Sequence, residues 1–89
     1  MNAADRKRVE KLAERLGALE DEANAIAIDL QEMADAEQEK FDNLSEGLQQ
    51  SERGQAIESS QQALESAKDA VEQLGSDAGN AKAELDGIE

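Results

Sequence analysis

The sequence contains no cysteine, histidine, proline, tryptophan or tyrosine, and Phe41 is its one aromatic residue. Without Cys and His, disulfides, thiol nucleophiles, His-based catalytic dyads and the usual zinc sites are excluded. One Phe supplies neither a platform for base stacking nor the lining of an enclosed ligand pocket. We therefore expect a protein that is not an enzyme and that uses no cofactor and no metal.

Positive charge is also scarce. The 89 residues include 22 Asp and Glu against 9 Lys and Arg, a formal net charge of −13. Phosphate binding needs a basic surface, so we expect no direct contact with nucleic acid. No apolar run approaches the roughly 18 residues of a membrane span, and no signal-peptide pattern opens the chain. These features favour a cytoplasmic, single-domain protein with no membrane partner.

Large apolar residues are few, but their spacing is regular. Leu, Ile, Val and Phe make up 16 of 89 residues, a fraction that with this charge is typical of disorder. Their three- and four-residue spacings are instead those of heptad repeats, which predict two long helices. The first repeat comprises Val9, Leu12, Leu16, Leu19, Ala23, Ile26, Leu30 and Met33, and the second comprises Ile57, Leu64, Val71, Ala78 and Leu85 with Ala67, Leu74, Ala81 and Ile88.

The two repeats predict an all-α fold, an antiparallel helical hairpin of the coiled-coil type. We expect helices over about residues 5–40 and 52–86, joined by a connection over about 41–51. Ser51 is the expected N-cap, and Gly75, Gly79 and Gly87 are expected to loosen the last turns by roughly 1 kcal/mol each. Residues 1–15 carry a net charge of +2 and residues 72–89 a net charge of −4, which favours antiparallel pairing of the helices.

A two-helix layer has a thin core, and Ala56, Ala63 and Ala70 widen the apolar stripe of the second helix. The sequence therefore predicts a homodimer that forms a four-helix bundle. The residues expected at the oligomer interface are Leu12, Leu16, Leu19, Ile26, Leu30, Ile57, Leu64, Val71, Leu74 and Leu85.

Acidic pairs at helical spacing and a basic cluster are the other chemical candidates. Asp35 with Glu39 and Glu65 with Asp69 can mark a divalent-ion site, but a solvated helix face is the simpler interpretation. A basic cluster near the N-terminus can contact a nucleic acid or a membrane, whereas pairing with the acidic end of the second helix is favoured. This basic cluster comprises Arg6, Lys7, Arg8, Lys11 and Arg15.

Residues 37–54 read EQEKFDNLSEGLQQSERG. This segment resembles the pattern E-Q-E-x-F-D-N-[LM]-P-E-x-L-Q-x-S-E-R-G of small acidic coiled-coil proteins of bacteriophages and prophages. The resemblance implies a helical hairpin, an origin in a mobile element and a location in the bacterial host cytosol. Ser45 stands where that pattern has Pro. We expect Phe41, Leu44 and Leu48 either to pack the end of the hairpin or to bind a partner.

Two functions remain open. The first is an interaction module that binds a basic, nucleic-acid-binding host protein, for example an inhibitor of a bacterial defence system that mimics DNA. The second is a structural coiled-coil spacer or assembly factor. Residues 16–89 carry 19 acidic and 4 basic side chains, which favours the first by charge complementarity. The residues expected to bind the partner are Glu32, Asp35, Glu39, Phe41, Leu44, Leu48, Glu65, Asp69 and Glu72.

Overall fold

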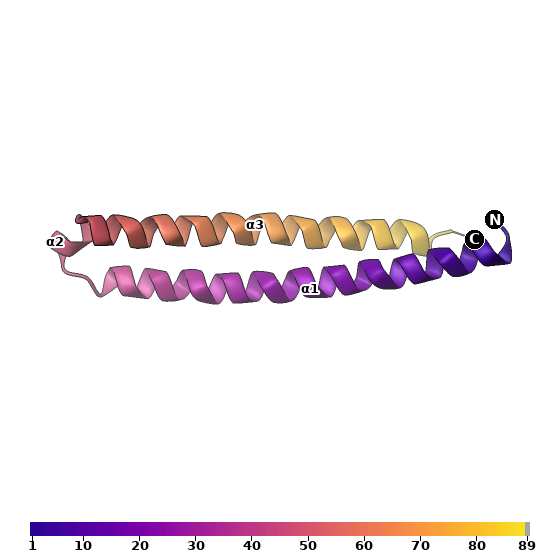
Figure 1. The fold of residues 1–89 in the computed structure, drawn as a ribbon, viewed down its shortest axis with the longest axis horizontal. Helices are drawn as coiled ribbons and strands as arrows, with labels where there is room; N and C mark the ends of the chain where they lie inside the picture. The colour runs from indigo at the N-terminus through magenta and orange to yellow at the C-terminus, as the bar shows by residue number, and fades with distance from the viewer. Residues whose placement is uncertain (89) are drawn as a thin grey trace.

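The structure, a computed structural model, describes residues 1–88 and confirms the predicted all-helical hairpin (Figure 1). Helix α1 (Ala3–Asp42) and helix α3 (Glu52–Asp86) run antiparallel, and the short helix α2 (Glu46–Gln49) lies in the connection. Residues 1–88 contain no strand. The molecule is a rod of 68 × 14 × 13 Å measured on Cα atoms, with both chain ends at the same end of the rod.

Helix α1 begins two residues before its predicted start because Asn2 is its N-cap. The Asn2 side chain accepts a hydrogen bond from the Asp5 backbone N–H at 2.8 Å, which satisfies one of the donors left open in a first helical turn. Lys40 lies in the last turn, where its positive charge complements the helix dipole. The helix ends at Asp42, two residues beyond its predicted end.

The connection is more ordered than the sequence suggests, since it contains α2. Ser45 is the N-cap of α2 and accepts from the Leu48 N–H at 3.4 Å. The Gln49 side chain donates to the Phe41 carbonyl at 3.1 Å and so ties α2 to the end of α1. Ser51 is the N-cap of α3, as predicted, and accepts from the Gly54 N–H at 3.5 Å.

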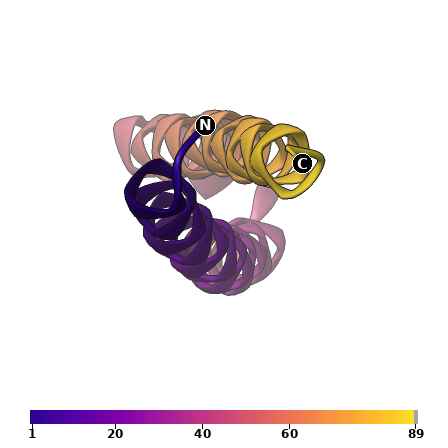
Figure 2. The ribbon, with the colours of Figure 1, turned by 90° about the vertical axis from the view of Figure 1, so that its right-hand side faces the viewer.

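Small residues make the closest contacts between α1 and α3, which form a single two-helix layer in the end view of Figure 2. The buried residues of the two long helices are all Ala or Gly, and no large side chain is fully buried. Around them, half-buried residues complete a contact seam with heptad spacing on both helices. The contact seam comprises Val9, Ala13, Leu16, Glu20, Ala23, Ala27, Leu30, Ala34, Glu37 and Phe41 of α1, and Gly54, Ile57, Gln61, Leu64, Lys68, Val71, Gly75, Ala78, Lys82 and Leu85 of α3.

The contact seam uses only half of each predicted heptad repeat. Val9, Leu16, Ala23 and Leu30 lie in it, but the intervening large side chains of α1 do not. Residues at seven-residue intervals from Ala13, among them Ala27 and Ala34, face α3 instead. Their small side chains let the two backbones approach closely. The exposed large side chains next to the contact seam are Leu12, Leu19, Ile26 and Met33 of α1, Leu74 of α3, and Ile88 just beyond the end of α3.

Gly75 and Gly79 do not interrupt α3, which continues to Asp86. Gly75 is buried against α1, and a Cβ atom at this position would lie 3.2 Å from the Cβ of Ala23. Gly75 therefore costs about 1 kcal/mol in helix propensity, but it allows α1 and α3 to approach closely at this position.

Gly54 and Gly47 provide a matched test of the packing at the connection. A Cβ at Gly54 would overlap the carbonyl oxygens of Leu48 and Gln49, whereas a Cβ at Gly47 meets nothing within 4 Å. We expect Gly54→Ala to lower the free energy of unfolding by about 1–3 kcal/mol. Gly47→Ala is expected to leave stability unchanged or raise it by up to about 1 kcal/mol. Urea unfolding followed by circular dichroism measures both, and equal stability of the two variants would contradict the packing shown.

Candidate protein-interaction surfaces

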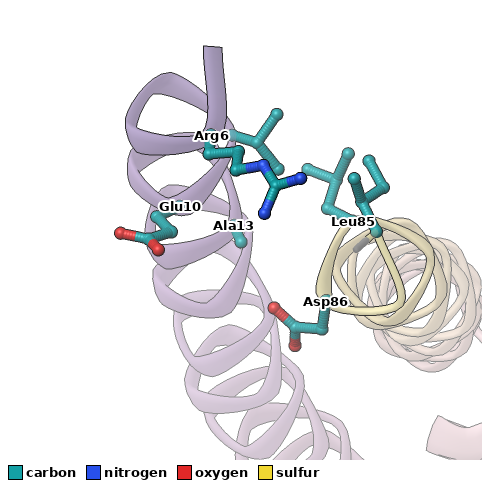
Figure 3. A pocket seen from close by; sticks show the side chains of 7 residues that line it. Arg6, Glu10, Ala13, Leu85 and Asp86 are labelled. Atoms are coloured by element: carbon teal, nitrogen blue, oxygen red, sulfur yellow. The ribbon is translucent and has the colours of Figure 1, made fainter. Parts of the chain in front are cut away.

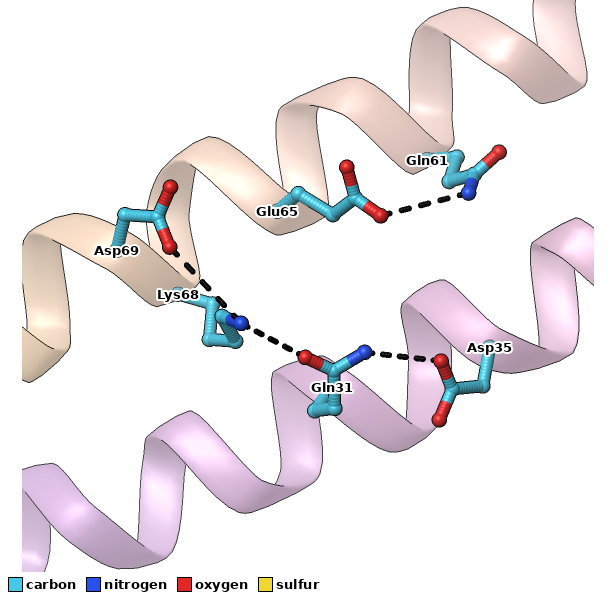
Figure 4. A network of polar contacts seen from close by, with 6 residues as sticks. All are labelled: Gln31, Asp35, Gln61, Glu65, Lys68 and Asp69. Atoms are coloured by element: carbon cyan, nitrogen blue, oxygen red, sulfur yellow. Dashed lines mark hydrogen bonds and ion pairs between the residues drawn. The ribbon is translucent and has the colours of Figure 1, made fainter.

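Two side-chain hydrogen bonds join α1 to α3 along one side of the rod, which we call the polar side. Lys68 Nζ donates to Gln31 Oε1 at 2.8 Å, as Figure 4 shows. Nearer the connection, Gln61 Nε2 donates to Gln38 Oε1 at 2.6 Å. The sequence analysis did not identify these residues. One pattern in the sequence could have indicated that this side of α3 faces α1. Polar residues and glycines alternate there at seven-residue intervals, at Gly54, Gln61, Lys68, Gly75 and Lys82.

Three of the predicted partner-binding acids gather around these bonds (Figure 4). Gln31 Nε2 donates to Asp35 Oδ1 at 2.8 Å, and Lys68 Nζ lies 3.9 Å from Asp69 Oδ1. Gln61 Nε2 makes a longer contact of 3.4 Å with Glu65 Oε1. The three carboxylates are exposed, so they present negative charge along the polar side.

The other predicted acids are exposed as well. Glu72 lines a shallow groove of the polar side together with Lys68 and Gln31. Glu32 and Glu39 lie seven residues apart on α1, on the stripe next to Asp35. The structure therefore brings four of the six predicted acids, Asp35, Glu65, Asp69 and Glu72, to one side of the rod.

Ion pairs neutralise little of this acidic surface. Within residues 1–88 the ion pairs are Lys40 with Glu37, Lys68 with Asp69 and Lys82 with Asp86, and no acidic side chain is buried. The same part of the chain has no cluster of three acidic side chains that could hold a metal ion. The acidic surface is thus a distributed charge and contains no candidate cation site in the described residues.

The pKa of Lys82 is raised above its ordinary value. The main cause is the hydrogen bond that Lys82 Nζ donates to Asp86 Oδ2 at 2.7 Å, followed by the charge of Asp86 and that of Glu20. The aliphatic part of Lys82 lies over Gly17, where a Cβ would come within 3.2 Å of Lys82 Cε. Lys82 is therefore a stably charged residue that also covers the contact seam near the chain ends.

The basic cluster does not pair directly with the acidic end of α3, contrary to the prediction. Arg6 extends from α1 toward Leu85 and lines a groove with Asp86 (Figure 3), but no ion pair joins the two helices in residues 1–88. The physical reason is geometric, since the first turns of α1 extend beyond the end of α3 (Figure 1). All five basic side chains of the cluster are exposed.

The side opposite the polar side carries most of the exposed large apolar residues of the two long helices, whereas Ile28 lies on the polar side. On each helix the residues opposite the polar side stand one position before residues of the contact seam, as Leu12 does before Ala13 and Leu74 before Gly75. They lie on the flank of the seam away from the residues that make the interhelix hydrogen bonds. In an antiparallel pair these two stripes emerge on the same side of the hairpin. We call this side the open apolar face, and it comprises Leu12, Leu19, Ile26 and Met33 of α1, Leu74 of α3, and Ile88 just beyond the end of α3.

The predicted interface residues thus divide into two groups. Leu16, Leu30, Ile57, Leu64, Val71 and Leu85 are half-buried in the contact seam. Leu12, Leu19, Ile26 and Leu74 lie on the open apolar face. At the other end of the rod, Phe41 and Leu44 are half-buried and Leu48 is exposed.

Comparison of the chain with protein-family models, with curated proteins and with solved structures yields no significant match. None of the helices in residues 1–88 has the length and apolar content needed to cross a membrane.

The scarcity of ion pairs predicts a stabilising effect of salt. Added NaCl screens the repulsion among exposed carboxylates more than it weakens three surface ion pairs. Between about 20 mM and 500 mM NaCl we expect the free energy of unfolding to rise by about 1 kcal/mol, or roughly 4–8 °C in Tm for a domain of this size. Thermal circular dichroism at neutral pH measures this change. A Tm that falls with added salt would mean that the ion pairs outweigh the repulsion.

Proposed function

We propose that this protein is a nonenzymatic interaction module of the phage and prophage type, whose acidic rod binds a basic, nucleic-acid-binding host protein as a homodimer. The observation that carries the proposal is the gathering of Asp35, Glu65, Asp69 and Glu72 on the polar side, in a chain with net charge −13. Such a surface attracts a basic groove by charge complementarity and accelerates encounter with it.

The shape of the molecule supports this mode of binding. The rod is 68 Å long and has no buried acid in its described part, so the carboxylates can follow an extended groove from one end to the other. A DNA-binding groove reads phosphates as a row of negative charges. Inhibition of a bacterial defence enzyme by competition with its DNA is the role that we propose for this surface.

An assembly factor or spacer is the second candidate, and the open apolar face favours it. Exposed apolar stripes of this length mark protein interfaces. A partner that covers this face would bind through apolar contacts, which salt does not weaken, whereas a basic partner would dissociate as salt rises. The two functions therefore differ in the salt dependence of binding.

The proposal predicts that charge on the polar side controls partner binding. The variant Asp35→Lys/Glu65→Lys/Asp69→Lys/Glu72→Lys is expected to weaken binding by roughly tenfold or more at low salt, and by much less at about 0.5 M, since exposed charges are screened. The partner is first captured from host lysate at graded salt, and its affinity for each variant is then measured. Circular dichroism checks that the helical content is unchanged.

Two further variants serve as controls. Asp35→Glu/Glu65→Asp/Asp69→Glu/Glu72→Asp keeps the charge and should bind like the unmodified protein. Truncation of Phe41, Leu44 and Leu48 to Ala tests the competing idea that the end of the hairpin is an apolar anchor, in which case binding is lost at every salt concentration. Full affinity of the charge-reversed variant would exclude the acidic surface as the binding site.

A further inference from the structure

The open apolar face is a row of large apolar side chains that the hairpin leaves exposed. Leu19 and Leu74 are 56% and 60% exposed, although Leu19 belongs to the heptad series from Leu12 to Met33 and Leu74 lies between Ala67 and Ala81 at the same spacing. Because no large side chain is fully buried between α1 and α3, the hairpin buries little apolar surface by itself. A neighbour on this face would convert a two-helix layer into a structure with an interior.

We infer that a second copy of this chain covers the open apolar face with its own open apolar face, and that the two hairpins run in opposite directions, with their connections at opposite ends. The inference rests on the homodimer of the proposed function and adds the surface and the orientation. The side of the rod that carries this face is 68 Å long and 14 Å wide measured on Cα atoms, on the order of 900 Å², close to the ~800 Å² per partner of a stable interface. The apolar stripe of α1 from Leu12 to Met33 spans about 32 Å of that length at 1.5 Å per residue, so it forms the centre of such a contact.

Heptad spacing makes the face self-complementary. Leu12, Leu19, Ile26 and Met33 follow one another at intervals of seven residues. When two copies of α1 stack in opposite directions about a two-fold axis near residue 22, Leu12 lies opposite Met33 of the partner subunit, and Leu19 lies opposite Ile26 of the partner subunit. Such isologous pairing is the usual way in which a homodimer closes.

Charge selects the direction. The third of the rod nearest the connection, residues 32–67, carries nine acidic and two basic residues. The third that holds the chain ends, residues 1–15 and 84–89, carries six acidic and five basic residues. Two hairpins with their connections together would place net charges of −7 and −7 side by side, whereas opposite directions pair −7 with −1 at both ends and reduce the repulsion.

The ends of the apolar stripe agree with this direction. Asp5 stands seven residues before Leu12, and Lys40 stands seven residues after Met33. Stacking of the two copies of α1 in opposite directions brings Asp5 close to Lys40 of the partner subunit, and the two-fold axis repeats this contact. The basic cluster, which makes no ion pair in residues 1–88, then lies beside the acidic connection of the second copy.

Distances between spin labels test the direction, and the absence of Cys from the chain lets a single introduced thiol be labelled. Gly47→Cys lies at the connection, where a side chain meets nothing within 4 Å. For opposite directions we expect a label-to-label distance close to the 68 Å length of the rod. Connections at the same end would instead give about 30 Å or less, because bundled helices pack about 8–10 Å apart.

Two more labelled variants complete the measurement. Ala4→Cys, at the other end of the rod, should also give a long distance. Ala25→Cys, near the middle of α1, should give a distance below about 40 Å in a dimer of either orientation. Short distances at both Gly47→Cys and Ala4→Cys would overturn the proposed direction and leave the homodimer intact.

Substitutions at equally exposed residues on the open apolar face and on the polar side test which side forms the dimer interface. Leu19→Glu and Leu74→Glu place a charge on the open apolar face, and Ile28→Glu places one at a side chain that is 61% exposed and lines the groove of the polar side. By analytical ultracentrifugation at micromolar concentration, we expect a species of twice 9.6 kDa for the unmodified protein and Ile28→Glu, and the monomer mass for the other two.

Each outcome has a separate meaning. Dissociation by Ile28→Glu but not by Leu19→Glu would place the interface on the polar side and overturn the inference. A monomeric unmodified protein would overturn both the inference and the homodimer. Binding of the host partner by the charge-reversed variants is measured independently, so a failure of the acidic-surface proposal is distinguishable from either result.

Discussion

The close approach of α1 and α3 at the Ala and Gly residues of the contact seam is the contact on which the rest of the molecule depends. Ala23 against Gly75 shows how tight it is, since one added methyl group at Gly75 would already be in contact at 3.2 Å. Small residues at a helix crossing allow backbone proximity and good packing density, but they bury little apolar area per residue. The hairpin therefore gains a well-defined geometry from this contact and only a modest hydrophobic stabilisation.

The small residues of the seam determine where the large residues lie. Because Ala13, Ala27 and Ala34 occupy the positions nearest α3, the Leu and Ile side chains next to them extend from the flank of the contact. The opposite flank is closed by polar side chains, with Lys68 bonded to Gln31 and Gln61 to Gln38. The rod thus has one apolar and one polar side, and a single hairpin can present the first to a copy of itself while the second carries charge to another partner.

The charge distribution gives the two sides different properties. Apolar burial is nearly independent of salt, whereas exposed carboxylates act through a field that salt screens within about 10 Å. In the dimer that we propose, self-association through the apolar side would therefore depend little on salt, whereas the proposed binding of a basic partner would depend on it strongly. The division also explains how a chain with 22 acidic residues folds at all, since none of the described carboxylates has to be buried and burial of an unpaired charge is costly.

The sequence by itself determined the two helices, their antiparallel order and both ends of the second helix, and it placed each end of the first helix within two residues. Heptad spacing and the absence of Pro predict long helices, and Ser51 is recognisable as a cap because a hydroxyl before an acidic residue is a local signal. The sequence alone also predicts that the acidic residues named as partner-binding are exposed.

Only the tertiary structure decided which stripe of each helix faces the other. Leu12 and Ala13 are adjacent in sequence and both satisfy a heptad repeat with Leu16, so periodicity does not distinguish between them. The choice depends on how closely two backbones can approach, which is a property of the pair of helices. The same limit applies to Gly54, whose importance comes from the carbonyl groups of the connection, and to Gln31 and Lys68, which lie far apart in sequence and meet only after the hairpin has formed.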